Sequence, residues 1–154
     1  MDYSSEGATE IAPSVVENKL FEPFVIPFNE WRAAKINTTM HIHTVDILAA
    51  GEICQGDRFS FSGYTSLELL KDWVNDRFYS FNNTVSIPVI PNDVDDTLKQ
   101  RILVICGREE PLYPAVIVKG RGLFIWGDEL KQTMRACEAI VTLLGIKLKV
   151  GATN

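Results

Sequence analysis

The chain has 154 residues, of which 46% are hydrophobic and 23% charged, and its 15 basic and 20 acidic side chains give a formal charge of −5. This length suffices for one ordinary domain that buries a core without disulfides or a structural metal. The acidic balance argues against general binding to nucleic acid and against a polybasic membrane patch. The sequence also lacks an apolar run of the ~18 residues that span a bilayer, so we expect neither nucleic acid nor membrane as partner.

The N-terminal segment predicts a cytoplasmic protein. Residues 1–18 contain four acids, no base and no long apolar run, whereas a secretory leader needs a basic start and a mitochondrial leader is rich in arginine. We expect residues 1–18 to form a flexible tail or, alternatively, an arm that docks on a partner. Residues 19–154 are expected to form a single domain. The three cysteines, an odd number without a CxxC pair, indicate free and mostly buried thiols in a reducing compartment.

The first half of the domain contains several strand patterns. Residues 20–28 carry two prolines among large apolar side chains, which predicts an extended segment laid over the core. The β-branched and apolar residues of 38–47 predict a strand, and the alternating phenylalanines of 57–62 predict a short one. Residues 84–90 predict another strand, in which Pro88 indicates a sheet edge or a strand end.

A helix is expected between these last two strands. Thr65 and Glu68 have the spacing of a capping box, in which each side chain satisfies a backbone N–H of the other residue. Apolar residues follow at helical spacing and predict an amphipathic helix over about 66–78. Trp73 lies beside this stripe and is expected in the core or at an interface. The stripe consists of Leu67, Leu70, Val74 and Phe78.

The second half alternates helices and strands. An acidic start at residues 92–96 predicts a helix that Gly107 ends. Apolar runs at 114–119 and 123–126 around a glycine-rich turn predict a hairpin. A last helix is expected from a cap at Asp128 to a stop at Gly145, followed by a short strand over 146–150. This alternation predicts an α/β layered domain.

Three blocks of the sequence together resemble a known family. They are Met40–Thr44, which reads MHIHT, residues 87–92, which read IPVIPN, and residues 114–140 with Trp126-Gly127 and a Cys-Glu pair. In order and spacing they resemble the class II aldolase/adducin family, and within it the methylthioribulose-1-phosphate dehydratases, over roughly residues 38–150. The resemblance implies a class II aldolase-like layered domain with a mixed central sheet covered by helices.

The resemblance also implies a chemistry that this sequence does not complete. The family holds zinc with three histidines, moves a proton with a carboxylate, and binds phosphate with a glycine-rich loop. His41 and His43 match two zinc ligands, and at i and i+2 they would share one face of a strand. Arg121, which is always cationic and cannot ligate zinc, stands at the third position, and the chain has no other histidine. Thr65 stands where the carboxylate is expected.

The phosphate loop has no counterpart either, because Gly7 is the only glycine before His41. We therefore expect a non-catalytic class II aldolase-like domain that acts as a structural or protein-interaction subunit, with protein partners or copies of itself and no cofactor. The alternative is a divergent zinc-dependent lyase or dehydratase acting on a small sugar phosphate, with a further zinc ligand from another chain. A third possibility is a module that binds a small molecule in the remaining cleft.

Five residues are the candidates for these roles. His41 and His43 are either a vestigial metal pair or ordinary strand residues facing a polar cleft. Arg121 is either a contact for an anion or a partner carboxylate, or a solvated turn residue. Trp31 and Trp73 are candidate interface anchors. A third tryptophan, Trp126, is expected in the core.

Overall fold

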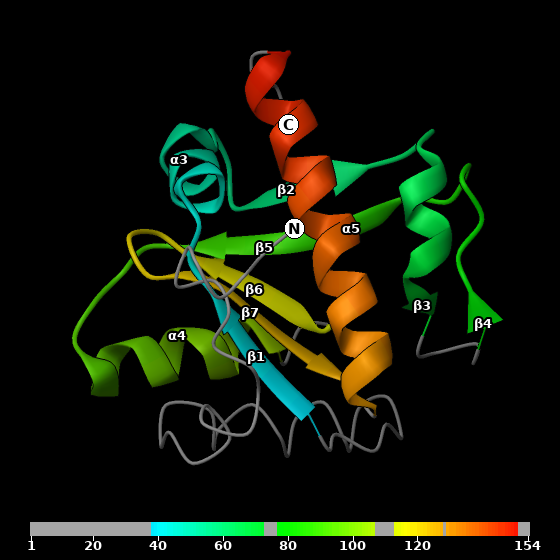
Figure 1. Ribbon diagram of the computed structural model, residues 1–154. Helices are drawn as coiled ribbons and strands as arrows, with labels where there is room; N and C mark the ends of the chain where they lie inside the picture. The colour runs from blue at the N-terminus through cyan, green and yellow to red at the C-terminus, as the bar shows by residue number, and fades with distance from the viewer. Residues whose placement is uncertain (1–37, 73–76, 107–112, 128, 151–154) are drawn as a thin grey trace.

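The computed structural model describes residues 38–72, 77–106, 113–127 and 129–150 (Figure 1). The predicted tail over 1–18, the extended segment over 20–28, Trp31, Trp73 and Asp128 lie outside the described residues. In chain order the elements are β1 (Thr38–Ile42), α3 (Val45–Ile53), β2 (Arg58–Phe61), the 3₁₀ helix η2 (Thr65–Leu69), β3 (Lys71–Asp72), β4 (Arg77–Phe78), β5 (Val85–Ile90), α4 (Asp95–Cys106), β6 (Ala115–Val118), β7 (Gly122–Gly127) and α5 (Leu130–Lys149).

A mixed sheet forms the centre of the domain. Its strand order is β1-β7-β6-β5-β2, and β3 and β4 form a separate two-stranded ribbon. β6 and β7 are joined by a tight turn and are antiparallel. β1 pairs with β7, and β2 with β5, in the antiparallel sense as well. β5 and β6 are parallel, and parallel neighbours need a crossover, which α4 supplies. The expectation of an α/β domain with a mixed sheet covered by helices is confirmed.

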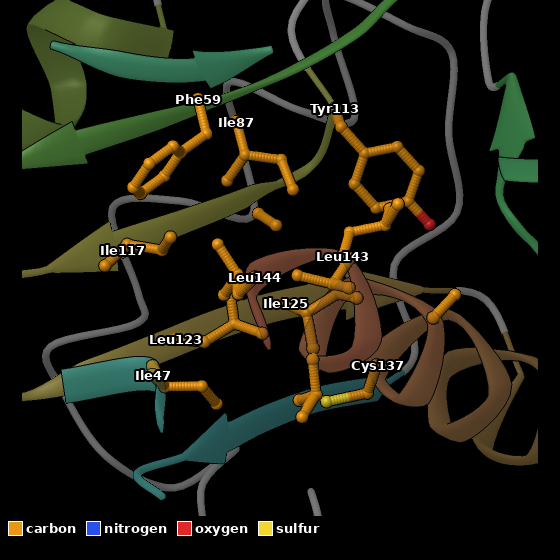
Figure 2. Packing of buried hydrophobic residues seen from close by; sticks show 14 of the residues in the cluster. Ile47, Phe59, Ile87, Tyr113, Ile117, Leu123, Ile125, Cys137, Leu143 and Leu144 are labelled. Carbon is orange, nitrogen blue, oxygen red and sulfur yellow. The ribbon is translucent and has the colours of Figure 1, made fainter. Parts of the chain in front are cut away.

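One face of the sheet is covered by α3, α5 and η2 and carries the main core (Figure 1). Alternate residues of the five strands point into this layer, as the period of two requires. Figure 2 shows Leu143 and Leu144 of α5 among Leu123, Ile125 and Ile117 of the sheet. All five side chains are buried, so α5 is held by a continuous apolar layer.

The other strand residues, which lie between the core-facing ones, belong to the opposite face of the sheet, where α4 lies (Figure 1). In the middle of the sheet these residues are apolar. Three apolar residues of α4 are buried as well. His41 of β1 lies on this face, because its neighbours Met40 and Ile42 point into the main core. The buried residues outside the main core cluster include Val116, Val118, Phe124 and Trp126 of the sheet and Leu98, Ile102 and Ile105 of α4. The expectation that Trp126 is a core residue is confirmed.

The strand predicted over 38–47 is too long. β1 ends at Ile42, and α3 begins at Val45. The hydroxyl oxygen of Thr44 accepts a hydrogen bond from the Ile47 N–H at 3.2 Å, which caps the helix start. After the cap the buried apolar residues follow helical spacing, since Ile47 and Ala50, three positions apart, are both buried.

The helix predicted over 66–78 is wrong. In the part of this segment that the structure describes, only the 3₁₀ helix η2 forms. Its N-cap position is Tyr64 and no side chain caps it, so the predicted capping box is wrong as well. Leu67 and Leu70 are buried as the stripe requires, but their spacing of three also fits a 3₁₀ turn. The Leu70 carbonyl then accepts from the Tyr79 N–H at 3.0 Å, so the chain continues as the β3–β4 ribbon.

Two further expectations fail for reasons of tertiary packing. Gly145 does not end α5, which runs to Lys149 and so includes residues 146–149 of the strand predicted over 146–150. Leu148 packs against the main core, and this contact draws the last turn into the helix. Pro88 does not mark an edge, because β5 lies between β6 and β2. The parallel pairing with β6 begins only at Val89, so the absent N–H of Pro88 costs no pairing there.

Candidate functional site

The two histidines lie together at the end of β1. Their ring centroids are 5.2 Å apart, with the ring planes tilted by 50°. His41 faces Phe124 of the adjacent strand β7 in the register, and the two rings stack with centroids 4.3 Å apart. Both histidines are partly buried. The structure therefore brings together the pair that the sequence singled out.

Arg121 joins this pair through its backbone. It lies in the turn between β6 and β7, and its carbonyl oxygen is 2.8 Å from Nε2 of His41. Because a carbonyl oxygen can only accept, Nε2 must carry the hydrogen in this contact. That nitrogen then has no lone pair to offer to a metal ion, whereas Nδ1 of the neutral ring keeps one.

The side chain of Arg121 reaches the start of α4. Its Nε donates to Oδ1 of Asn92 at 2.7 Å, and its Nη2 donates to the backbone carbonyl of Asp93 at 3.1 Å. Both acceptors belong to the loop between β5 and α4. A guanidinium suits this position because its planar fork can serve two acceptors at once.

Asp93 extends the contacts into α4. One carboxylate oxygen accepts from Nη2 of Arg101 at 2.9 Å, and the other accepts from the Val94 N–H at 2.8 Å. The Val94 hydrogen bond and then the Arg101 guanidinium lower the pKa of the Asp93 carboxyl below its usual value. Asp93 is therefore ionised throughout the neutral range.

Two glycines allow the turn to approach β1 so closely. Gly120 and Gly122 have φ values of 78° and 120°, which side chains rarely adopt. A Cβ at Gly122 would overlap the Ile42 carbonyl oxygen and lie 3.0 Å from Cβ of His43. The backbone contact between Arg121 and His41 depends on this absence of a side chain.

These residues do not fit a zinc ion held by this chain alone. Within the described ranges, no group of three His, Cys, Asp or Glu side chains is arranged to hold a metal. A structural or catalytic zinc needs at least three protein ligands. Arg121, which stands where the resemblance implies a third ligand, is a cation whose side chain is turned toward Asn92 and Asp93.

A cavity of about 400 Å³ opens between α4 and the end of β5. Its strand side is apolar, and Arg101, which also contacts Asp93, is part of the lining. Neither histidine nor Arg121 takes part in its wall. Its lining residues are Asp57, Val89, Ile90, Pro91, Thr97, Gln100, Arg101, Val104 and Ile105. The sequence did not single out this cavity, because its walls come from three segments that meet only in the fold.

Comparison with known proteins defines the class to which this fold and site belong. The sequence profile of one protein family, the class II aldolase and adducin N-terminal domain, matches residues 31–148. The chain therefore belongs to the class II aldolase and adducin family. Residues outside the described ranges, including the predicted interface candidates Trp31 and Trp73, fall within this match.

The relatives include methylthioribulose-1-phosphate dehydratases. The enzyme of that name from Pseudomonas paraeruginosa is 28% identical over 126 residues, which cover 78% of this chain and 56% of the relative. A probable methylthioribulose-1-phosphate dehydratase from Leishmania braziliensis is 22% identical over 147 residues, covering 96% of this chain and 65% of the relative. The chain thus spans less than two thirds of the length of these curated relatives.

A solved structure supports the fold. YgbL from Escherichia coli, described as a putative aldolase/epimerase/decarboxylase, superposes with a TM-score of 0.53 at 16% identity, covering 88% of this chain and 57% of that one. At this identity the likeness shows the fold alone. Among the helices that the structure describes, none is long and apolar enough to cross a membrane.

The site differs from the sequence expectation in its extent. His41, His43 and Arg121 come together as the resemblance implies, but Asn92 and Asp93 were not singled out as their neighbours. The signals for them are the IPVIPN block, which ends at Asn92, and the acidic start of the predicted helix at 92–96, which indicates a helix N-terminus. A partner contact by Arg121 stays a prediction, since the two acceptors described here belong to the same chain.

Proposed function

We propose that this chain is a class II aldolase-like domain that carries out no zinc-dependent catalysis with its own residues and acts as a structural or protein-interaction subunit of a larger assembly. The observation that carries the proposal is Arg121, which stands where the family's third zinc ligand is expected. Its carbonyl engages Nε2 of His41, and its guanidinium is committed to Asn92 and Asp93.

The contrast between scaffold and site supports this proposal. The sheet and its helices keep the family's architecture, with an apolar layer on each face. The residues at the expected metal position instead form hydrogen bonds with one another. A domain that keeps its core but lacks the zinc ligands retains the surfaces of the fold without the catalytic chemistry of the family. Assembly with other subunits needs only those surfaces.

Metal analysis of the purified chain tests the catalytic half of this proposal. We expect zinc well below one equivalent in the wild type and in a His41→Ala/His43→Ala variant. Stoichiometric zinc in the wild type that this double variant loses would overturn the proposal. Asp46→Ala/Glu52→Ala is a matched control, because it removes two exposed potential ligands from α3 without touching the histidines.

The assembly half is tested by light scattering on the purified chain and by its native mass in an extract. We expect a defined homo-oligomer or a stable complex with a second protein. A monodisperse monomer in both measurements would contradict an assembly role.

The second candidate is a divergent dehydratase or lyase acting on a small sugar phosphate. The proximity of the two histidine rings and the names of the relatives favour it. It requires a further metal ligand from another chain. Dehydration of methylthioribulose 1-phosphate in the presence of zinc, lost in His41→Ala but kept in Asp46→Ala, would establish this candidate; we expect no turnover above background.

A further inference from the structure

The cavity between α4 and the end of β5 is separate from the histidine site. None of His41, His43 and Arg121 lines it. Its volume of about 400 Å³ falls within the range of pockets that hold small molecules in proteins. Its walls come from β5, from α4 and from the residue before β2. What the cavity binds can therefore be considered apart from any metal at the histidines.

The cavity has an apolar floor and a largely polar rim. Val89 and Ile90 of β5 and Ile105 of α4 are buried and form the floor. The exposed residues of the lining form the rim, and three of the five are polar. They are Asp57, Pro91, Thr97, Gln100 and Val104. A molecule that enters the cavity would bury an aliphatic body on the floor and keep its polar atoms near the rim.

Arg101 is the lining residue whose hydrogen-bond donors are incompletely used. A guanidinium carries five N–H donors. Nη2 of Arg101 donates to Oδ2 of Asp93 at 2.9 Å, whereas Nε is buried and meets no acceptor within the described ranges. A buried donor without an acceptor is unfavourable, so an acceptor supplied at this wall of the cavity would be favoured.

We propose that the cavity binds a small uncharged molecule that has an aliphatic body and one carbonyl-type acceptor. The body lies on the floor, and the acceptor receives a hydrogen bond from the guanidinium of Arg101. This side chain is 40% exposed, so it can turn an unused donor toward the ligand while Nη2 keeps its contact with Asp93. The inference goes beyond the proposed function and does not depend on whether the histidine pair binds a metal.

The charges of the lining favour an uncharged ligand over an anion. The lining has one cation, Arg101, which is paired with Asp93, and one anion, Asp57, which is paired with Arg58. The described lining residues therefore offer no excess positive charge. An anion would lose hydration on entering without a cation to compensate for it, whereas a neutral carbonyl needs only a donor. For the same reason a sugar phosphate is a poor occupant of this cavity.

Two probes of the same shape test the ligand class in the full chain. Isocaproamide and isocaproate share a branched aliphatic body and differ only in the amide or carboxylate head. In ¹⁵N-labelled protein we expect isocaproamide to shift the signals of β5 and α4 saturably, with a dissociation constant of about 1 mM or below. Isocaproate should bind roughly tenfold more weakly. Equal or tighter binding of isocaproate would overturn the ligand class, and the absence of a saturable shift at these signals would overturn the site.

A matched pair of tryptophan variants tests the location. Val104 is 69% exposed at the rim, so Val104→Trp can lay an indole over the cavity without repacking the core, and it should weaken isocaproamide binding roughly tenfold. Val45→Trp, at a residue that is 76% exposed on α3, is the control and should bind like the wild type. Equal affinities in the two variants would overturn the assignment to this cavity.

The role of Arg101 is tested by a substitution that keeps an unbranched side chain and removes its donors. Arg101→Met should weaken isocaproamide binding roughly tenfold, the loss of one hydrogen bond to a charged donor. Arg135→Met, at an exposed arginine of α5, should leave the affinity unchanged. An unchanged affinity in Arg101→Met would overturn the assigned hydrogen bond. The wild-type ratio of the two probes tests the ligand class without any substitution, and zinc content bears only on the proposed function.

Discussion

The two faces of the central sheet are built on different principles. The face under α3, α5 and η2 is closed by apolar side chains, and its members are nearly all inaccessible to water. The face that carries His41 is apolar in its middle and polar at the end of β1, where His41, Arg121, Asn92 and Asp93 meet. Successive residues of one strand supply both faces, because side chains alternate along a strand.

Under the function proposed above, this difference explains how the fold can persist without the family's chemistry. The apolar face accepts only substitutions that keep volume and hydrophobicity, so it preserves the family architecture. The polar end of β1 contributes few buried contacts. An arginine is accommodated there because its side chain finds acceptors in Asn92 and Asp93.

The largest expected effect comes from breaking the apolar face. Leu144→Ala removes a fully buried side chain between α5 and the sheet and should lower the free energy of unfolding by about 2–5 kcal/mol, measured by urea denaturation. Val104→Ala, at a residue that is 69% exposed on α4, is the control and should change it by no more than ~0.5 kcal/mol. Similar small losses in both variants would contradict the idea that buried side chains such as Leu144 hold the apolar face together.

The next effect is expected where the turn crosses toward the polar end of β1. Gly122→Ala places a methyl group against the Ile42 carbonyl and forces a residue with a side chain to a φ of 120°. Backbone strain and overpacking together should cost at least ~2 kcal/mol of unfolding free energy. The His41 ring signals should change in the same variant. A Gly122→Ala protein as stable as the wild type would show that the turn does not need its close approach.

A smaller effect of opposite sign is expected on the apolar side. Gly145 lies within α5, and a Cβ built there meets nothing within 4 Å. Gly145→Ala should therefore raise the free energy of unfolding by roughly 0.5–1 kcal/mol, because alanine is the better helix former. Calorimetry of the two proteins at one pH measures it. Destabilisation would mean that α5 ends at Gly145, as the sequence pattern suggested.

The smallest effect concerns the charge of Asp93. In the folded chain the pKa of Asp93 lies below its usual value of 3.8. The ionised carboxylate therefore stabilises the folded state above pH 3.8. This stabilisation is lost as the pH falls through the lower pKa of the folded state. Asp93→Asn should be slightly less stable than the wild type at a constant difference from pH 5 to pH 7. Below about pH 4 the difference should shrink. A difference that grows on acidification would contradict the assigned direction of the pKa shift.

Local patterns predicted the elements whose packing agrees with their periodicity. The strands at 57–62, 84–90, 114–119 and 123–126 correspond to β2, β5, β6 and β7, and the acidic start at 92–96 leads into α4. In each of these segments the apolar or alternating pattern, the bounding turn residues and the tertiary packing favour the same element. Burial of the free thiols of Cys54 and Cys137 also agrees with expectation.

The failures occur where a pattern fits two structures. Leu67 and Leu70 are spaced for an α-helix or a 3₁₀ turn, and the hydrogen bond from Tyr79 to Leu70 decides for the shorter element. Gly145 is a common helix stop, but the packing of Leu148 carries α5 past it. In both cases a contact distant in the chain outweighs a local preference of about 1 kcal/mol.

The sequence by itself determined the family, the sequence order of most elements and the inability of two histidines to complete a three-histidine site. These follow from residue types and spacings, which need no coordinates. Only the tertiary structure decided what Arg121, at the position where a third ligand was expected, contacts. The acceptors of Arg121 lie 28 and 29 residues away along the chain, and they become its neighbours because α4 must cross over between two parallel strands.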